Sequence, residues 1–118
     1  MAESEALAVA RRYHGAWTGK DFEAAGRRLS ESLKTDTPVK TYKGKDDFLE
    51  AVRGFGQIVT RVEMLAEFGD EEQALLLYDL DLVQIGKLRI AEHFIVRNGF
   101  ITLIRHVHDT APFRAPGG

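Results

Sequence analysis

The strongest constraint on the fold is a period-two alternation of apolar and polar residues that runs through the second half of the chain. Apolar side chains occupy every other position in residues 62–68, 76–82 and 88–96, with Glu92 as the one exception, and turn residues separate these segments. This alternation is typical of β-strands that bury one face. Because the connections are short, we predict a four-stranded antiparallel meander that ends with a strand over residues 101–109.

The first half of the chain follows the helical spacing of three and four residues. Residues 3–18 predict an amphipathic helix, and Asp21 is placed to cap a second helix whose buried stripe ends at Leu29. Residues 45–59 predict a third helix. Between the second and third helices, residues 33–42 lose the helical period and predict a short, irregular strand pair.

Helices in the first half and strands in the second half define an α+β protein. We expect a curved antiparallel sheet with three N-terminal helices on one face, and a pocket on the concave side that the helices fill only in part. A chain of 118 residues forms a single domain, residues 1–118, and residues 112–118 are expected to form a loose C-terminal tail.

The composition excludes several classes of protein. With 16 basic and 18 acidic residues, the chain lacks the positive field that holds a nucleic acid. It contains no cysteine, which excludes a disulfide framework, a thiolate nucleophile and cysteine-containing metal sites. The acidic N-terminus and the lack of an apolar run of about 20 residues indicate neither a signal peptide nor a membrane span. We therefore expect a cytoplasmic protein with no nucleic-acid and no membrane partner.

One acidic residue lies within a row of apolar side chains. Glu92 shares a strand face with Leu88, Ile90, Phe94 and Val96. An unpaired carboxylate in such a row would cost several kcal/mol, so something must compensate it. Either Glu92 is hydrogen-bonded or paired, or it stays protonated with a raised pKa, as carboxyl groups that act as acids do. A structural and a functional role remain open for it.

The last predicted strand carries two histidines on one face. His106 and His108 share one face of this strand, and Ile101, Leu103 and Val107 share the other, so the meaning of the histidines depends on which face is concave. Histidines that face outward would be surface or subunit-contact residues. Histidines that face inward would lie near Glu92 on the preceding strand, where imidazole and carboxylate suit a metal ion. This spacing is a weak metal signal, and we expect neither a metal nor a cofactor.

Further pocket candidates come from the helices, the central strands and the irregular segment. The phenols of Tyr13 and Tyr78 either reach the pocket or are satisfied inside the core. Asp36 is either a carboxylate at the pocket rim or a turn-forming residue. The large apolar residues that we expect to fill the core and to contact a ligand are Trp17, Phe55, Phe94 and Ile104.

Several strings, in their order and spacing, resemble the SnoaL-like branch of the nuclear transport factor 2-like superfamily. They are residues 12–22 (RYHGAWTGKDF), Pro38, residues 44–48 (GKDDF), residues 91–94 (AEHF) and residues 97–106 (RNGFITLIRH). The resemblance covers nearly the whole chain and implies a cone of three helices wrapped by a curved sheet, with a pocket inside. This fold hosts isomerases, hydrolases, polyketide cyclases and binding proteins, so it does not by itself name an activity.

The resemblance also implies roles for single residues. Tyr13 matches the position of the oxyanion-hole tyrosine of ketosteroid isomerases, and Glu92 matches their protonated oxyanion-hole aspartate. The same register implies that His106 and His108 face the cavity.

The positions of the family bases differ. The isomerase base directly precedes the proline, where this chain has Thr37, and Asp36 stands one residue earlier and is expected to face the other way. His106 stands where limonene epoxide hydrolase and the SnoaL cyclases have an acid/base aspartate, and Tyr78 stands where the epoxide hydrolase has an arginine.

These residues predict a pocket for an apolar small molecule. If the pocket is catalytic, His106 is the general acid or base, since an imidazole suits both roles. Glu92 orients it or, when protonated, joins Tyr13 or Tyr78 in stabilising an enolate or alkoxide. The reaction would be a cofactor-free proton transfer next to a carbonyl, such as isomerisation, dehydration or cyclisation. The alternatives are a binding protein without turnover and a dimeric interaction module.

The outer face of the predicted sheet favours a homodimer. It combines exposed apolar side chains with charges of both signs. The apolar side chains would be buried in a contact between two copies, and the charges could fix the register of that contact. These residues are Leu75, Leu77, Leu103 and Val107 among Asp79, Asp81, Arg89 and Arg105.

Overall fold

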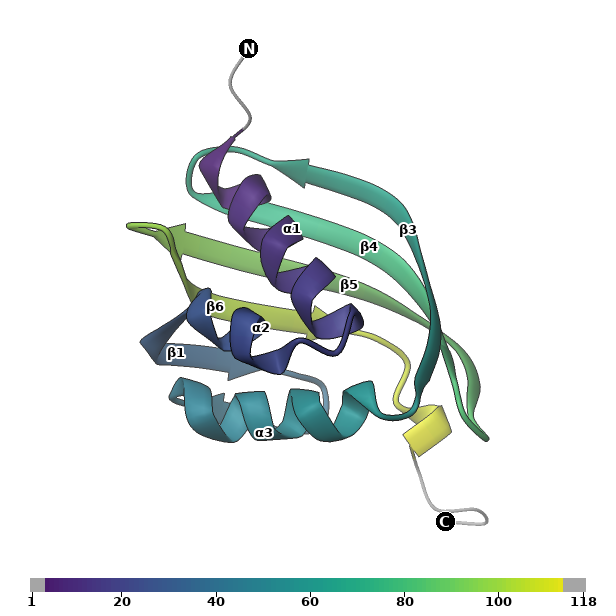
Figure 1. Cartoon of the computed structure of the whole chain (residues 1–118). Helices are drawn as coiled ribbons and strands as arrows, with labels where there is room; N and C mark the ends of the chain where they lie inside the picture. The colour runs from purple at the N-terminus through teal and green to yellow at the C-terminus, as the bar shows by residue number, and fades with distance from the viewer. Residues whose placement is uncertain (1–3, 114–118) are drawn as a thin grey trace.

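The structure is a computed structural model that describes residues 4–113 (Figure 1). Within this range, helices dominate the first half of the chain and strands dominate the second half. In chain order the elements are α1 (Glu5–Thr18), α2 (Phe22–Arg27), β1 (Leu29–Asp36), β2 (Thr41–Lys43), α3 (Lys45–Gly56), β3 (Val59–Gly69), β4 (Gln73–Leu82), β5 (Gly86–Arg97), β6 (Phe100–Val107) and the 3-10 helix η1 (Ala111–Phe113).

The strands form one curved sheet in the order β2-β1-β6-β5-β4-β3. β3 to β6 pair antiparallel with their chain neighbours, which confirms the predicted meander. However, β1 pairs parallel with β6 and antiparallel with β2, so the sheet is mixed rather than antiparallel throughout. The alternation pattern identifies strands but not the edge that an early strand joins, which is why this pairing was not predicted.

Two predicted boundaries were wrong because strand pairing overrides the local helical pattern. Asp21 caps α2 as expected, accepting a hydrogen bond from the backbone N–H of Ala24 at 3.1 Å. Leu29, predicted as the end of the helical stripe, instead pairs with Ile101 in the first register position of β1. Likewise, Val59, predicted as the last residue of the third helix, pairs with Leu82 at the start of β3.

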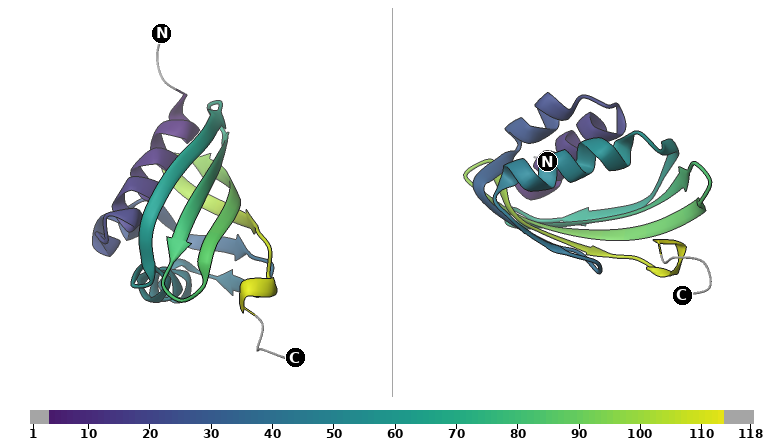
Figure 2. Two further views of the ribbon diagram at one scale, coloured as in Figure 1. Left: turned by 90° about the vertical axis from the view of Figure 1, so that its right-hand side faces the viewer. Right: turned by 90° about the horizontal axis from the view of Figure 1, so that it is seen from below.

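The three helices pack on the concave face of the sheet, which curves around them (Figure 2). The rows predicted to face inward on β4 and β5 are buried, which confirms the register of both strands. On β6 the predicted alternation was wrong at Ile101, which is fully buried instead of facing outward. The register of the β5–β6 pairing shifts between Ile95 and Val96. This irregularity interrupts the simple alternation along β6 and accounts for the inward position of Ile101.

The C-terminal segment is more ordered than predicted where the structure describes it. Pro112 and Phe113, expected in a loose tail, belong to η1, and the backbone N–H of Phe113 donates to the carbonyl of Thr110 at 3.0 Å. The remainder of the predicted tail lies outside the described residues. None of the helices in residues 4–113 has the length and apolar character required to cross a membrane.

Candidate functional site

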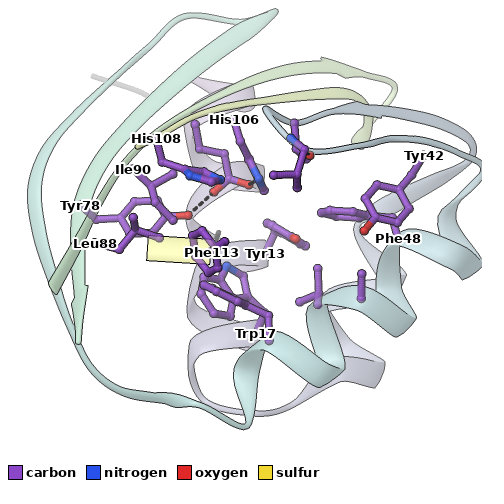
Figure 3. A pocket seen from close by; sticks show the side chains of 16 residues that line it. Tyr13, Trp17, Tyr42, Phe48, Tyr78, Leu88, Ile90, His106, His108 and Phe113 are labelled. Carbon is purple, nitrogen blue, oxygen red and sulfur yellow. Dashed lines mark hydrogen bonds and ion pairs between the residues drawn. The ribbon is translucent and has the colours of Figure 1, made fainter. Parts of the chain in front are cut away.

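A pocket of about 450 Å³ lies on the concave side of the sheet, between the helices and the strands (Figure 3). Its wall is predominantly aromatic and aliphatic, and its polar groups come from the sheet, from α1 and from the β1–β2 connection. The lining residues are Tyr13, Trp17, Thr37, Val39, Tyr42, Phe48, Ala51, Val52, Phe55, Tyr78, Leu88, Ile90, Glu92, His106, His108 and Phe113. No lysine or arginine is among these described lining residues.

The structure brings together most of the residues proposed from the sequence. Tyr13, Trp17, Phe55, Tyr78, Glu92, His106 and His108 all line this pocket. Tyr42 and Phe48 lie across the pocket from Tyr78 and His108 (Figure 3). The ring centroid of Phe48 is 5.8 Å from that of Tyr42 and 6.2 Å from that of His106. The candidate groups therefore share one cavity with an apolar opposite wall.

Three proposed ligand contacts lie elsewhere. Phe94 and Ile104 pair with each other two positions along their strands from Glu92 and His106, and both are fully buried in the core. The ring of Phe94 packs edge-on against Tyr13 at 5.9 Å between centroids, and Phe94 is not among the residues that line the pocket. Asp36 is exposed and accepts a hydrogen bond from Thr41 Oγ1 at 3.2 Å, which makes it a residue of the β1–β2 hairpin.

Sequence reasoning missed part of the pocket wall. Phe48 and Val52 lie in the helix predicted over residues 45–59, but neither was proposed as a pocket residue. Tyr42 lies in a strand of three residues, too short for an alternation signal, and Phe113 was placed in the tail. No local pattern distinguishes a buried aromatic residue that fills the core from one that faces a cavity.

A hydrogen-bonded group of three side chains forms the polar part of the pocket. The hydroxyl of Tyr78 donates to Oε1 of Glu92 at 2.7 Å, and Nε2 of His106 lies 2.6 Å from Oε2 of the same carboxylate. Antiparallel pairing positions them, because Glu92 stands opposite His106 in the β5–β6 register. Glu92 is only 1% exposed, so both of its oxygens are satisfied inside the protein.

The pKa of Glu92 is lowered overall, although burial alone would raise it. The charge and hydrogen bond of His106, the hydrogen bond from Tyr78 and the charge of His14 together outweigh the burial. Of the two states left open for this carboxyl group, the paired and ionised one is therefore favoured over the protonated one. Burial, followed by the charge of Glu92, raises the pKa of Tyr78, which keeps its phenol protonated as a donor.

The contact with Glu92 determines which nitrogen of His106 is available to a ligand. A carboxylate only accepts, so the hydrogen must reside on Nε2 of His106. Nδ1 has no hydrogen-bond partner among residues 4–113. Nδ1 is therefore the atom that can accept a proton from a bound molecule, or donate one when the ring is an imidazolium.

Tyr13 contributes a second unoccupied polar group. Tyr13 is 1% exposed and lines the pocket, and its hydroxyl has no hydrogen-bond partner in the described part of the chain. Burial, and to a lesser extent the charge of Glu92, raises the pKa of Tyr13 well above its ordinary value, so the phenol stays protonated. Tyr13 can therefore donate a hydrogen bond to a ligand oxygen.

His108 lies beyond the end of β6 and differs from His106 in its bonded nitrogen. Its Nδ1 lies 2.9 Å from the backbone carbonyl of Asp109, and its ring packs against Phe113 at 5.5 Å between centroids. Within residues 4–113, no group of three or more His, Cys, Asp or Glu side chains is arranged to hold a metal ion.

These observations define a class of protein, an α+β cone in which a pocket lies between the curved sheet and the helices. No protein-family model and no curated protein sequence matches the chain. Among solved structures, a protein from Kribbella flavida, described as being of known function, is 36% identical with a TM-score of 0.91, over 94% of this chain and 92% of that chain.

Two further structures place the fold. An NTF2-like protein of unknown function from Cytophaga hutchinsonii is 16% identical with a TM-score of 0.78, over 96% of this chain and 98% of that chain. A steroid delta-isomerase from Pseudomonas aeruginosa is 15% identical with a TM-score of 0.76, over 91% of this chain and 81% of that chain. The chain therefore has the NTF2-like fold, which ketosteroid isomerases and epoxide hydrolases share.

Proposed function

We propose that this protein is a cofactor-free enzyme that moves a proton next to the carbonyl group of an uncharged, apolar small molecule. The observation that carries the proposal is the Tyr78–Glu92–His106 group, with contacts of 2.7 and 2.6 Å, at the wall of an otherwise apolar pocket. A carboxylate that orients a histidine through one ring nitrogen leaves the other nitrogen as a general base, as in catalytic triads.

Each polar group of the pocket has a distinct role in this proposal. His106 takes a proton at Nδ1 from the carbon next to the carbonyl, and Glu92 stabilises the imidazolium that forms. Tyr13 donates its free hydroxyl to the enolate oxygen that develops. Tyr78 holds the second oxygen of Glu92, so that the carboxylate keeps its orientation.

The pocket wall determines which molecules the site accepts. Its aromatic side chains favour a flat or ring-containing compound, and the absence of lysine and arginine among the described lining residues disfavours carboxylate or phosphate ligands. A volume of about 450 Å³ falls within the ordinary range for small-molecule sites.

A binding protein without turnover is the second candidate. It is favoured by Thr37, which lines the pocket at the position where ketosteroid isomerases have their base carboxylate. In this case a ligand would stabilise the protein and be recovered unchanged.

The experiment that separates the two candidates uses β-tetralone, an uncharged bicyclic ketone, in deuterated water. We expect the protein to accelerate deuterium incorporation next to the carbonyl, measured by NMR, and His106→Asn to reduce this acceleration about 100-fold. His93→Asn is the control, because His93 lies on the outer face and does not line the pocket. Thermal stabilisation by β-tetralone without exchange would support the binding protein, and equal exchange by wild type and His106→Asn would contradict the role of His106.

We also propose that the protein is a homodimer that pairs through the outer face of the sheet. On this face Val107 is 68% exposed and Leu75 is 40% exposed. Beside them, Nε of Arg89 donates to Oδ1 of Asp79 at 2.7 Å. Exposed apolar side chains beside fixed charges suit a self-complementary contact.

A further inference from the structure

Two apolar side chains of the pocket differ from the rest of its described wall because they are exposed. Val39 is 66% exposed and Phe113 is 40% exposed, whereas the other described lining residues are buried or half-buried. Tyr13 and Glu92 are each only 1% exposed. The pocket therefore has a closed end with polar groups, at Tyr13 and Glu92, and an open apolar rim, which Val39 and Phe113 form.

The β1–β2 connection holds Val39 in place at the rim. The hydroxyl of Thr37 donates to the backbone carbonyl of Lys40 at 2.7 Å and accepts from the backbone N–H of Lys40 at 3.0 Å. Pro38, directly before Val39, fixes its own φ angle. Val39 therefore lies inside a closed turn, and its position does not depend on a ligand.

Phe113 is held at the same rim by contacts of its own. Its backbone N–H donates to the carbonyl of Thr110 at 3.0 Å, and the backbone N–H of Ala111 donates to Oδ1 of Asp109 at 2.9 Å. Its ring packs against His108, another lining residue, at 5.5 Å between centroids. Because both rim side chains are ordered beforehand, a ligand that covers them does not bear the entropy cost of fixing them.

The chemistry of the rim selects what can cover it. The side chains of Val39 and Phe113 contain no hydrogen-bonding group, so a polar or charged substituent placed on them would lose water without gaining a partner. An alkyl group would remove apolar surface from water, which raises affinity by about 2- to 4-fold for each methylene that is covered. A pocket of about 450 Å³ suits a ligand long enough to reach from the closed end to the rim.

We propose that Val39 and Phe113 determine specificity, and that the site takes an uncharged ketone with an alkyl arm on the side opposite its carbonyl group. The carbonyl oxygen accepts from Tyr13 at the closed end, and the arm lies on Val39 and Phe113. This inference rests on the proposed function for the placement of the carbonyl group.

The test uses a series of 4-alkylcyclohexanones, from 4-methyl to 4-pentyl, in which the arm and the carbonyl lie at opposite ends of the ring. Trp17 is the one tryptophan of the sequence and lines the pocket, so its fluorescence reports binding whether or not the ligand reacts. We expect the Kd of wild type to fall by about 30-fold from the methyl to the pentyl compound.

Variants of the rim should reduce only the effect of the arm. Val39→Thr and Phe113→Ala should each bind the methyl compound within about 2-fold of wild type and the pentyl compound about 5-fold more weakly. The matched controls are Val83→Thr and Phe100→Ala, because both residues are 47% exposed and neither lines the pocket. The controls should keep the full dependence on arm length, and thermal unfolding establishes that each variant is folded.

A variant at the closed end should show the opposite pattern. Tyr13→Phe removes the hydroxyl that donates to the carbonyl, so it should weaken every member of the series by a similar factor, about 5-fold. Unchanged affinity of Tyr13→Phe for all members would contradict the placement of the carbonyl group.

The outcomes separate this inference from the proposed function. A wild-type Kd that does not fall with arm length, or rim variants that lose the same factor for all members, would overturn the role of the rim, while deuterium exchange of these ketones would still support proton transfer. Binding that depends on arm length without exchange would overturn proton transfer and leave the role of the rim. If wild type binds no member of the series, both are wrong.

Discussion

At the scale of single residues, Glu92 connects the stability of the protein with the chemistry of its pocket. It is buried, and its two oxygens bind Tyr78 and His106. Burial raises the pKa of this carboxyl group, but its hydrogen-bonded and charged partners lower the pKa by more. The pKa in the folded state therefore lies below the ordinary value of 4.5. A carboxyl group of this kind stabilises the fold above its unfolded-state pKa and loses that contribution as the pH falls through the folded-state pKa.

Glu92→Gln should therefore destabilise the protein at neutral pH, by about 1–3 kcal/mol, because the neutral amide can accept from only one of Tyr78 and His106, and its NH2 group then faces the other buried donor. The deficit should shrink as the pH falls below the ordinary value of 4.5, where wild type loses its ionised carboxylate. Urea denaturation over a range of pH measures this. Glu50→Gln, at an exposed position of α3, is the control, and a pH-independent deficit would contradict the assignment of an ionised Glu92.

At the scale of elements, the packing of α2 against α3 depends on a close approach at Gly56. A Cβ atom at this position would lie 2.6 Å from Cζ and 3.0 Å from Cε1 of Phe22, which is the first residue of α2. Phe22 is itself confined, because the guanidinium of Arg53 lies over its ring at 5.4 Å from the centroid. The contact lies at the end of α3, and α3 supplies Phe48, Val52 and Phe55 to the wall of the pocket.

Gly56→Ala should destabilise the protein by about 1–3 kcal/mol, because the added methyl group overlaps an aromatic ring that has little room to move. Gly54→Ala is a matched control two residues earlier in the same helix, where no atom lies within 4 Å of the added carbon. This control should stabilise the helix by about 0.5–1 kcal/mol. Thermal unfolding of both variants checks the pair, and equal effects would show that the contact with Phe22 is unimportant.

At the scale of the whole molecule, the two faces of the sheet have separate tasks in our proposals. The concave face holds the pocket, and the convex face carries Leu75 and Val107, which are exposed. Burial of an apolar patch of this kind between two copies would leave both pockets open on the other side of the sheet.

The homodimer predicts that a charge in this patch separates the copies without harming the pocket. Val107→Asp combined with Leu75→Asp should convert a dimer into a monomer at micromolar concentration, measured by analytical ultracentrifugation. Exchange of β-tetralone should persist in the monomer. Sedimentation of wild type as a monomer would contradict the proposal.

Much of the fold follows from local patterns. The alternation in β4 and β5 predicted which side chains face inward, and it identified Glu92 as a buried acid before its partners were known. These features are predictable because successive side chains of a strand point to opposite faces of the sheet, so the pattern of apolar residues shows which face is buried. The helices α1 and α3 were predicted for the same reason, from a period of 3.6 residues.

Other features depended on the tertiary structure. The parallel pairing of β1 with β6, the burial of Ile101 and the placement of Phe113 at the pocket all join segments that are distant in the chain or shifted by a strand irregularity. The same holds for the free nitrogens of His106 and His108, because the partner that each ring binds decides which nitrogen remains for a ligand. The sequence by itself therefore determined the faces of the strands and helices, whereas only the tertiary structure decided their partners, since hydrogen bonding and register between distant segments leave no periodic signal in the chain.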